Sequence, residues 1–329
     1  MTSPDSRAPV RFGVLGCADI AWRRTLPALC ANPDATPVAI ASRTPQKAQR
    51  FADRFGCAAV HGYDALLARP DIDAVYVPLP AMLLAPWVTR ALEAGKHVFA
   101  EKPLSASRAE SEALVRLARE RGLVLRENAM FLHHSQHARV ADLVADGAIG
   151  ELRGFRSAFT IPPKPEGDIR YRPEVGGGAL LDVAVYPLRA ALYFLGPELT
   201  VVGATLRRRQ GAVLSGSVLL TTPSGIPAQL TFGMEHSYRT DYEILGSTGR
   251  LSVDRVFTPP ASWQPVVRVE RQDHREEIVL PADDQFARIV EDFVGAVARD
   301  AGTGSELDAS VRLVGLIDDM ARQAVYADR

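Results

Sequence analysis

Between Val10 and about Asn128, short apolar runs alternate with amphipathic segments, and this alternation limits the folds open to the chain more than any other feature. Four runs have the length and composition of strands: RFGVLG, PVAIAS, DAVYVPL and HVFAE. Segments with helical periodicity, such as TPQKAQRFADRFG and APWVTRALEAG, separate them. Strands joined through helices pair in parallel by right-handed crossovers, so this part of the chain predicts a doubly wound parallel sheet covered by helices.

The pattern changes after residue 128. Strand-like runs, from LRGFRSAFTI to PVVRVERQ, now follow one another without helices between them, and turn sequences such as TTPSGIP and GSTGR separate the runs. This predicts an α+β domain with a large, mostly antiparallel open sheet. One long helix from Gly178 to about Leu195 is expected within it, and helices from about Asp284 and Ser305 are expected to close the chain. The α/β chain is therefore predicted to form two domains, residues 1–128 and 129–329.

Composition and charge narrow the class of protein. Apolar residues make up 47% and charged residues 23% of the chain, as in globular proteins, and 38 basic residues nearly balance 39 acidic ones. We therefore expect no nucleic-acid or membrane partner. Cys17, Cys30 and Cys57 have neither a disulfide-framework nor a zinc-site spacing. No signal peptide is apparent, and Asp182 and Arg189 interrupt the most apolar segment, so a cytoplasmic protein is expected.

The first predicted strand runs into Gly16-Cys17-Ala18-Asp19-Ile20-Ala21 and then a helix, which is the context of a dinucleotide-binding turn. Gly16 would form the tight turn, and Ala21 would allow close contact between helix and sheet. Ala18 stands where this fingerprint usually has its middle glycine. We expect its methyl group to displace the phosphates slightly while the backbone donors and the helix dipole remain. A plain strand-turn-helix is the alternative.

The end of the second predicted strand indicates which dinucleotide the turn would hold. An NAD enzyme usually carries Asp or Glu about 20 residues downstream, where the carboxylate binds the ribose 2′-hydroxyl. Here the strand ends in Ser42-Arg43, and Lys47 follows one helical turn later. A hydroxyl and two cations would bind a 2′-phosphate that a carboxylate would repel, so we predict NADPH. A solvated helix start is the alternative for these three residues.

Two segments carry the proton donor and polar groups that hydride chemistry on a carbonyl requires. Lys102 follows the fourth strand, at the edge of a parallel sheet where ligands bind. In GGGALLDVAVYPL, Asp182 and Tyr186 stand four residues apart on one expected helix and would share a face. The glycines before them would let another group approach closely. The alternatives are a surface lysine and an Asp-Tyr pair that bond each other.

These motifs resemble the glucose-fructose oxidoreductase, inositol dehydrogenase and rhizopine-catabolism (Gfo/Idh/MocA) family. The likeness spans nearly the whole chain, through GCADIA, YVPLP, AGKHVFAEKPLS and GGGALLDVAVYPL. It implies an N-terminal Rossmann domain and a C-terminal domain for substrate binding and oligomerisation. More narrowly, ENAMFLHHSQH and DIRYRPEVGGGALLDVAVYPL are similar to the sugar 3-ketoreductases of actinomycete deoxysugar pathways, in particular those that serve kijanose.

The resemblance implies an NADPH-dependent oxidoreductase of antibiotic deoxysugar biosynthesis, which reduces the C-3 keto group of a dTDP-linked 3,4-diketo-2,6-dideoxyhexose. Lys102 would be the acid, because the nascent nicotinamide cation depresses its pKa, and Tyr186 would orient the sugar or relay the proton. Asp182 would orient ribose or sugar hydroxyls. The expected cofactor-binding residues are Gly16, Ala18, Asp19, Ile20, Ala21, Ser42, Arg43, Lys47, Leu79, Glu101, Asn128, Arg170 and Asp182.

The same resemblance implies a homo-oligomer, either a dimer or a tetramer, formed through the C-terminal sheet. Two alternative functions are a free-sugar (xylose or glucose) or dihydrodiol dehydrogenase of the same family, and a non-catalytic NADP-sensing protein. His133, His134 and His137 lack an acidic partner or an H-E-x-x-H pattern, so we expect no metal and assign them to substrate contact or a polar helix face. Arg23 and Arg24 are expected either at the phosphates or on the surface.

Overall fold

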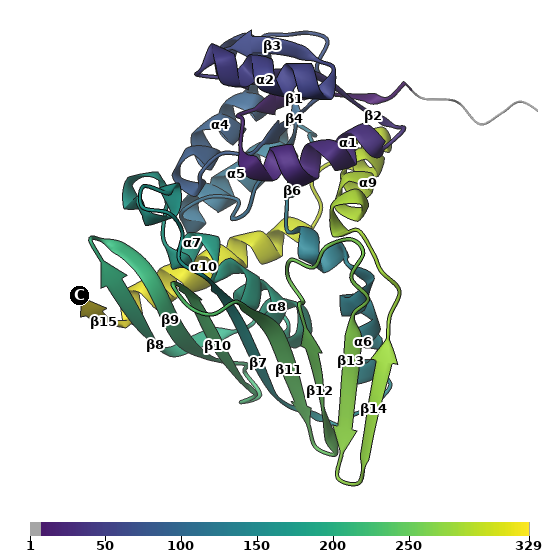
Figure 1. Ribbon diagram of the computed structural model, residues 1–329, viewed down its shortest axis with the longest axis vertical. Helices are drawn as coiled ribbons and strands as arrows, with labels where there is room; N and C mark the ends of the chain where they lie inside the picture. The colour runs from purple at the N-terminus through teal and green to yellow at the C-terminus, as the bar shows by residue number, and fades with distance from the viewer. Residues whose placement is uncertain (1–7, 329) are drawn as a thin grey trace, which may run out of the picture. The chain divides into compact units, whose positions relative to one another are not determined.

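The computed structural model describes residues 8–328, which form two compact units (Figure 1). The first unit consists of the chain up to Met130 together with Phe286–Asp308. The second consists of Phe131–Gln285 together with the chain from Ala309 onward. The chain therefore leaves the first unit, builds most of the second, returns to the first, and ends in the second.

The first unit is built on a parallel sheet of six strands in the order β3-β2-β1-β4-β5-β6. The order reverses beside β1, which pairs with β2 on one side and with β4 on the other. All pairs in this sheet are parallel, so the carboxyl ends of the strands form one edge. This confirms the predicted doubly wound Rossmann sheet. The sequence pattern missed β3 and β6, which have only four and three residues. The strands are β1 (Val10–Leu15), β2 (Ala35–Ser42), β3 (Ala58–His61), β4 (Ala74–Val77), β5 (His97–Ala100) and β6 (Leu125–Glu127).

The helices of the first unit connect these strands, and one further helix comes from the returning segment. That helix, α9, is anchored by Phe293, whose ring stacks on Phe99 with 5.3 Å between ring centroids and contacts Phe12 at 5.7 Å. The phosphate turn leads into a π-helical turn, η1, and wider turns of this kind often occur at functional sites. The helices are η1 (Ala21–Thr25), α1 (Leu26–Ala31), α2 (Pro45–Phe55), α3 (Tyr63–Leu67), α4 (Ala81–Glu93), α5 (Arg108–Glu120) and α9 (Gln285–Ala298).

The second unit is built on a sheet of nine strands in the order β14-β13-β12-β11-β7-β10-β9-β8-β15. The β7-β10 and β8-β15 pairs are parallel and the other pairs are antiparallel, which confirms the predicted mostly antiparallel sheet. The strands are β7 (Leu152–Ile161), β8 (Thr200–Arg209), β9 (Ala212–Thr221), β10 (Pro227–Met234), β11 (Arg239–Gly246), β12 (Gly249–Asp254), β13 (Val266–Arg271), β14 (His274–Val279) and β15 (Val325–Asp328).

The two faces of this sheet differ in character, as expected for an antiparallel sheet with one covered side. On one face helix α8 packs against β7, where Phe194 contacts Phe155. On the other face exposed charges pair across strands, as between Arg250 and Glu270 at 2.7 Å. The helices of the second unit are η2 (Met130–His133), α6 (Ser135–Ala145), η3 (Ile169–Tyr171), η4 (Pro173–Val175), α7 (Ala179–Asp182), α8 (Val185–Leu195) and most of α10 (Glu306–Gln323).

The single helix predicted from Gly178 to Leu195 was wrong, because the chain breaks it into α7 and α8. The segment that ends at Asp182 meets α8 at 44°. Pro187 explains the break, since it has no N–H to donate to the carbonyl of Val183 and its ring would crowd that carbonyl in a continuous helix. In residues 8–328 no single helix is long and apolar enough to cross a membrane; this bent pair passes that test by length and composition only.

Candidate active site

The turn after β1 has the backbone that a dinucleotide-binding turn requires. Gly16 has φ +127°, which side chains rarely allow, and a Cβ there would lie 2.9 Å from the side chain of Leu79 and 3.7 Å from the hydroxyl of Tyr63. The Gly16 N–H donates to the carbonyl of Ala41 at 3.0 Å, which ties the turn to the end of β2. Gly16, Leu79 and Tyr63 are therefore neighbours at the carboxyl edge of the sheet.

The end of β2 brings polar groups to this turn. Ser42 is buried, and its hydroxyl accepts the Thr44 N–H at 3.1 Å. Burial raises the pKa of the Cys17 thiol in the turn, while the Ser42 hydroxyl and the charge of Lys47 oppose that rise. Ser42 and Lys47 thus act on the turn from the neighbouring strand end.

Arg43 lies beside the same turn through its contact with Tyr63, a residue that the sequence did not indicate. Burial raises the pKa of the Tyr63 phenol, and the charge of Arg43 and a hydrogen bond from it oppose the rise. Because the Tyr63 hydroxyl lies beside Gly16, the guanidinium of Arg43 is held next to the turn. Exposed cations and a buried hydroxyl beside a glycine turn fit the 2′-phosphate and pyrophosphate of NADP.

The remaining residues of the turn begin the helix. Ala18 and Ile20 are half-buried, and Ala21 is buried where η1 starts. Asp19 is exposed and forms an ion pair with Arg23, in which Nε donates to Oδ2 at 2.7 Å. Arg23 is therefore engaged at the helix surface, one of its two expected places.

The carboxyl ends of β4, β5 and β6 carry a buried polar network. The Tyr76 hydroxyl and the Asn128 amide both donate to Oε1 of Glu101, each at 2.7 Å. Tyr76 also contacts the Thr25 hydroxyl in η1 at 3.0 Å. Burial raises the pKa of Glu101, whereas the bonds from Tyr76 and Asn128 and the charge of the adjoining Lys102 lower it.

Asn128 also offers an acceptor. Its side-chain oxygen is buried and has no hydrogen-bond partner among residues 8–328. A buried amide oxygen without a donor costs free energy, so this atom fits a site that a polar ligand completes. The half-buried Lys102 follows Glu101 at the same strand edge, where the sequence pattern expected it.

In the second unit, two predicted cofactor residues lie together. Arg170 donates from Nε to Oδ2 of Asp182 at 2.8 Å and also pairs with Asp168 at 3.2 Å. The glycines before α7 explain the contact, because a Cβ at Gly177 would lie 2.5 Å from the carbonyls of Ile169 and Arg172. The group that approaches these glycines is therefore the chain's own loop, which seats Arg170 against Asp182.

Tyr186 stands at the start of α8 among aromatic rings. Its ring meets Phe159 edge-on at 4.8 Å and lies 5.5 Å from Phe257 and 5.7 Å from Phe131. The break between α7 and α8 means that Asp182 and Tyr186 do not share one helix, so the predicted common helix face was wrong. Packing against three phenylalanines fixes the direction of the Tyr186 ring.

The histidines have structural partners. His137 is buried, with Nδ1 3.1 Å from the Tyr242 hydroxyl and Nε2 3.1 Å from the Val256 carbonyl, and burial lowers its pKa to about 3. His134 is buried too, and its Nδ1 accepts the Gln136 N–H at 3.2 Å at the start of α6. Over residues 8–328 no group of three or more His, Cys, Asp or Glu could hold a metal ion.

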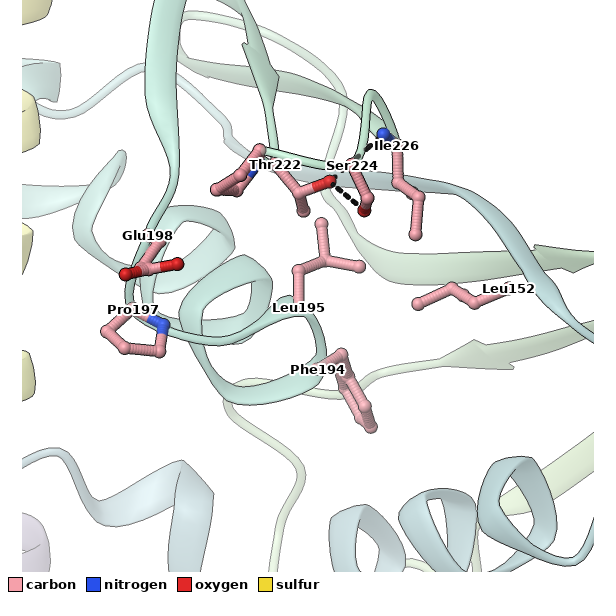
Figure 2. A pocket seen from close by; sticks show the side chains of 9 residues that line it. Leu152, Phe194, Leu195, Pro197, Glu198, Thr222, Ser224 and Ile226 are labelled. Carbon is pink, nitrogen blue, oxygen red and sulfur yellow. Dashed lines mark hydrogen bonds between the residues drawn. The ribbon is translucent and has the colours of Figure 1, made fainter.

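A pocket of about 460 Å³ lies within the second unit (Figure 2). It is formed by the carboxyl end of α8, the start of β7 and the β9-β10 turn, with Leu195, Leu152 and Ile226 among its lining. Tyr186 stands at the opposite end of α8. The pocket is therefore separate from the aromatic surroundings of Tyr186.

Two family models match the chain. The model of the oxidoreductase family with an NAD-binding Rossmann fold (GFO_IDH_MocA) matches residues 10–129, and a GFO/IDH/MocA C-terminal domain matches residues 137–252. The chain belongs to the Gfo/Idh/MocA oxidoreductase family. This confirms the family that the EKP and GGGALLDVAVYPL motifs indicated.

Relatives and solved structures cover both units of this Gfo/Idh/MocA chain. The dTDP-3,4-didehydro-2,6-dideoxy-alpha-D-glucose 3-reductase of Actinomadura kijaniata is 58% identical over 97% of this chain and 96% of the relative. The enzyme of that name from Streptomyces antibioticus is 58% identical over 94% and 95%. The crystal structure of KijD10, a 3-ketoreductase from A. kijaniata in complex with NADP and TDP-benzene, covers 98% of this chain and 99% of its own at 57% identity and a TM-score of 0.96. Solved KijD10 structures include K102A and Y186F variants.

Proposed function

We propose that this chain is an NADPH-dependent sugar 3-ketoreductase, which reduces the C-3 keto group of a dTDP-linked 3,4-diketo-2,6-dideoxyhexose. The observation that carries the proposal is the 58% identity, over 97% of the chain, to a reductase named for that sugar. The likeness covers both units, so it includes the second unit, which is proposed to bind substrate, as well as the Rossmann sheet. Shared fold alone would not support a shared substrate.

The cofactor is proposed to lie along the carboxyl edge of the six-stranded sheet. When bound, NADPH supplies the hydride. Arg43, Lys47 and Ser42 would hold the 2′-phosphate, and the turn from Gly16 would hold the pyrophosphate at a helix N-terminus. The complete proposed set is Gly16, Ala18, Asp19, Ile20, Ala21, Ser42, Arg43, Lys47, Leu79, Glu101, Asn128, Arg170 and Asp182.

Lys102 is proposed to give the proton to the C-3 oxygen, and Tyr186 to orient the sugar or relay that proton. An ammonium next to an ionised carboxylate keeps its proton until negative charge develops on the substrate oxygen. The neighbouring Glu101 supports this role, because its pKa responds to the charge of Lys102.

The domain roles and the assembly are also proposals. Residues 1–128 would bind NADP, and residues 129–329 would bind substrate and form a homo-oligomer, a dimer or tetramer. The exposed apolar side chains of Leu219 on β9 and Leu245 on β11 support an interface on the open sheet. We also propose a cytoplasmic location without nucleic-acid or membrane partners, in line with the nearly balanced charge of the chain.

An assay with the enzymatically prepared dTDP-3,4-diketo-2,6-dideoxyhexose tests the function directly. NADPH oxidation should accompany formation of the 3-hydroxy sugar, identified by mass spectrometry and NMR. Turnover only on free xylose, glucose or a dihydrodiol would move the assignment to another dehydrogenase of the family. NADPH binding without turnover on any of these would indicate an NADP-sensing protein.

Arg43→Ala tests the cofactor preference. Loss of one charge-assisted contact should weaken NADPH binding about thirtyfold and leave NADH binding nearly unchanged. Arg54→Ala is the matched control, because Arg54 stacks on Trp22 at 4.1 Å instead of facing Tyr63. Fluorescence titrations of both cofactors measure the effect, and equal weakening of NADPH and NADH would refute the 2′-phosphate assignment.

A further inference from the structure

We propose that Tyr76 is a positioning residue of the reductase, which holds Glu101 as a carboxylate beside Lys102 through a relay of buried hydrogen bonds that begins at Thr25. The inference rests on the proposed function and deepens it, because it gives a role to Tyr76, the first residue of the YVPLP motif, and to Thr25, neither of which was assigned one from the sequence. Tyr76 lies on β4, one strand away from Glu101, and its side chain is fully buried.

The direction of each hydrogen bond in this relay is fixed by the donors present. Tyr76 has one hydroxyl proton, which it donates to Oε1 of Glu101 at 2.7 Å. The Thr25 hydroxyl, 3.0 Å from the Tyr76 oxygen, must therefore donate to Tyr76 and not accept from it. Hydrogen bonds that run in one direction polarise one another, so Thr25 makes Tyr76 a stronger donor to the carboxylate.

Glu101 needs this support because its surroundings work against its charge. It is buried, and burial raises its pKa, so loss of the donors that oppose this effect would favour the protonated, uncharged form. The groups that act on it come from three strand ends: Tyr76 on β4, Lys102 after β5 and Asn128 after β6. Glu127, a buried carboxyl on β6, accepts the Leu104 N–H at 3.0 Å.

The charge interaction between Glu101 and Lys102 acts equally on both groups. The interaction by which the charge of Lys102 lowers the pKa of Glu101 favours the protonated form of Lys102 by the same free energy. A Glu101 that stays ionised therefore attracts the ammonium of the proposed acid and helps to orient it, and this attraction is lost at low pH when Glu101 takes up a proton. Tyr76 does not touch the reacting atoms in this scheme, and it acts through Glu101 only.

Tyr76→Phe is the direct test, because it keeps the ring that packs 5.4 Å from Phe99 and removes only the hydroxyl. The pH at which Glu101 takes up a proton should rise by about one unit, from the loss of one hydrogen bond to a charged group. Infrared difference spectroscopy measures this midpoint through the carbonyl stretch of the protonated acid, with Glu101→Gln identifying the band. The acid limb of the kcat profile should move to higher pH by a similar amount.

Matched variants separate positioning from stability. Tyr242→Phe also removes a buried tyrosine hydroxyl, the one beside His137. It should leave both midpoints, that of the infrared titration and that of the acid limb of kcat, unmoved even if it lowers Tm. Thr25→Val should shift both midpoints upward by less than Tyr76→Phe does, whereas Thr25→Ser keeps the donor and should shift neither. The Thr25 pair keeps the test decisive if Tyr76→Phe does not fold.

Two results would overturn the proposal. Infrared midpoints that stay unmoved in Tyr76→Phe and Thr25→Val would show that the relay does not control Glu101. A moved infrared midpoint with an unmoved acid limb would show that Glu101 is tuned without consequence for the reaction. The infrared titration needs no turnover, so a chain that fails to reduce the diketo sugar refutes the proposed function while this measurement still decides the relay.

Discussion

Lys102 and Tyr186, the two proposed catalytic residues, are held in contrasting ways in the two units. Lys102 adjoins a buried carboxylate whose charge is set by hydrogen bonds from Tyr76 and Asn128. Tyr186 is surrounded by phenylalanine rings at 4.8 to 5.7 Å. The first environment is polar and controls a protonation state, whereas the second is apolar and controls an orientation.

The difference matches what each residue is asked to do. A general acid must carry its proton at the working pH and release it as negative charge develops, so its free energy depends on nearby charges. A tyrosine that orients a sugar keeps its proton throughout, and it needs a rigid ring more than a tuned pKa. Substitutions around Lys102 should therefore change a protonation state, whereas substitutions around Tyr186 should change an orientation.

Lys102→Met is expected to have the largest effect, because it removes the proposed acid while keeping a side chain of similar length. We expect kcat to fall about a thousandfold, within the range for general acid catalysis, while the NADPH Kd stays nearly unchanged. Steady-state kinetics and NADPH fluorescence titration measure the two quantities. Lys164→Met, at a lysine outside the proposed site, is the control, and a loss of NADPH affinity as large as the loss of kcat would contradict the role.

The second-largest effect is expected from low pH, which should lower the stability of the folded chain through His137 in the second unit. The folded chain keeps this buried histidine neutral down to about pH 3, whereas the unfolded chain protonates it below about pH 6.5. The unfolded state binds more protons in this window, so stability falls as the pH falls, by about 2 kcal/mol between pH 6.5 and 4.5.

Urea unfolding of the wild type and His137→Asn over that range measures this contribution. The wild type should lose stability more steeply with falling pH than the variant, whatever the stability of the variant at neutral pH. His274→Asn replaces an exposed histidine and should keep the wild-type slope. Parallel slopes for wild type and His137→Asn would mean that this histidine titrates alike in both states.

Much of the fold was predictable because buried strands are runs of apolar residues, which can be recognised in the local sequence. The runs at β1, β2, β4 and β5 are apolar and almost wholly buried, so their pattern indicated strands. β3 is as short as β4 and β5 but mostly exposed, so it left no such pattern. The apolar stripe of α9 indicated a helix, but the stripe does not say which sheet it covers, and only the structure shows its contact with Phe12 and Phe99.

The candidate site was predictable only where a local motif carries it. Gly16, Ser42 and Lys102 stand at strand ends, and strand ends can be located in a sequence. Tyr76 and Tyr63 could not be found in this way, because their partners are close only through strand order and pairing. Val77 pairs with Ala100 across β4 and β5, which brings Tyr76 to Glu101 over a separation of 25 residues.

Tyr186→Phe is expected to have the smallest effect, and it tests whether orientation or proton transfer is the role of the tyrosine. The variant keeps the ring among Phe131, Phe159 and Phe257, so Tm should stay within a few degrees of the wild type. If Tyr186 orients the sugar through one hydrogen bond, its loss should lower kcat/KM about tenfold, with NADPH affinity unchanged.

Tyr193→Phe removes a more exposed hydroxyl from the same helix and should leave kcat/KM unaltered. A fall as large as that of Lys102→Met would instead make the tyrosine a necessary part of proton delivery, and the contrast between a polar unit that sets charge and an apolar unit that sets direction would fail.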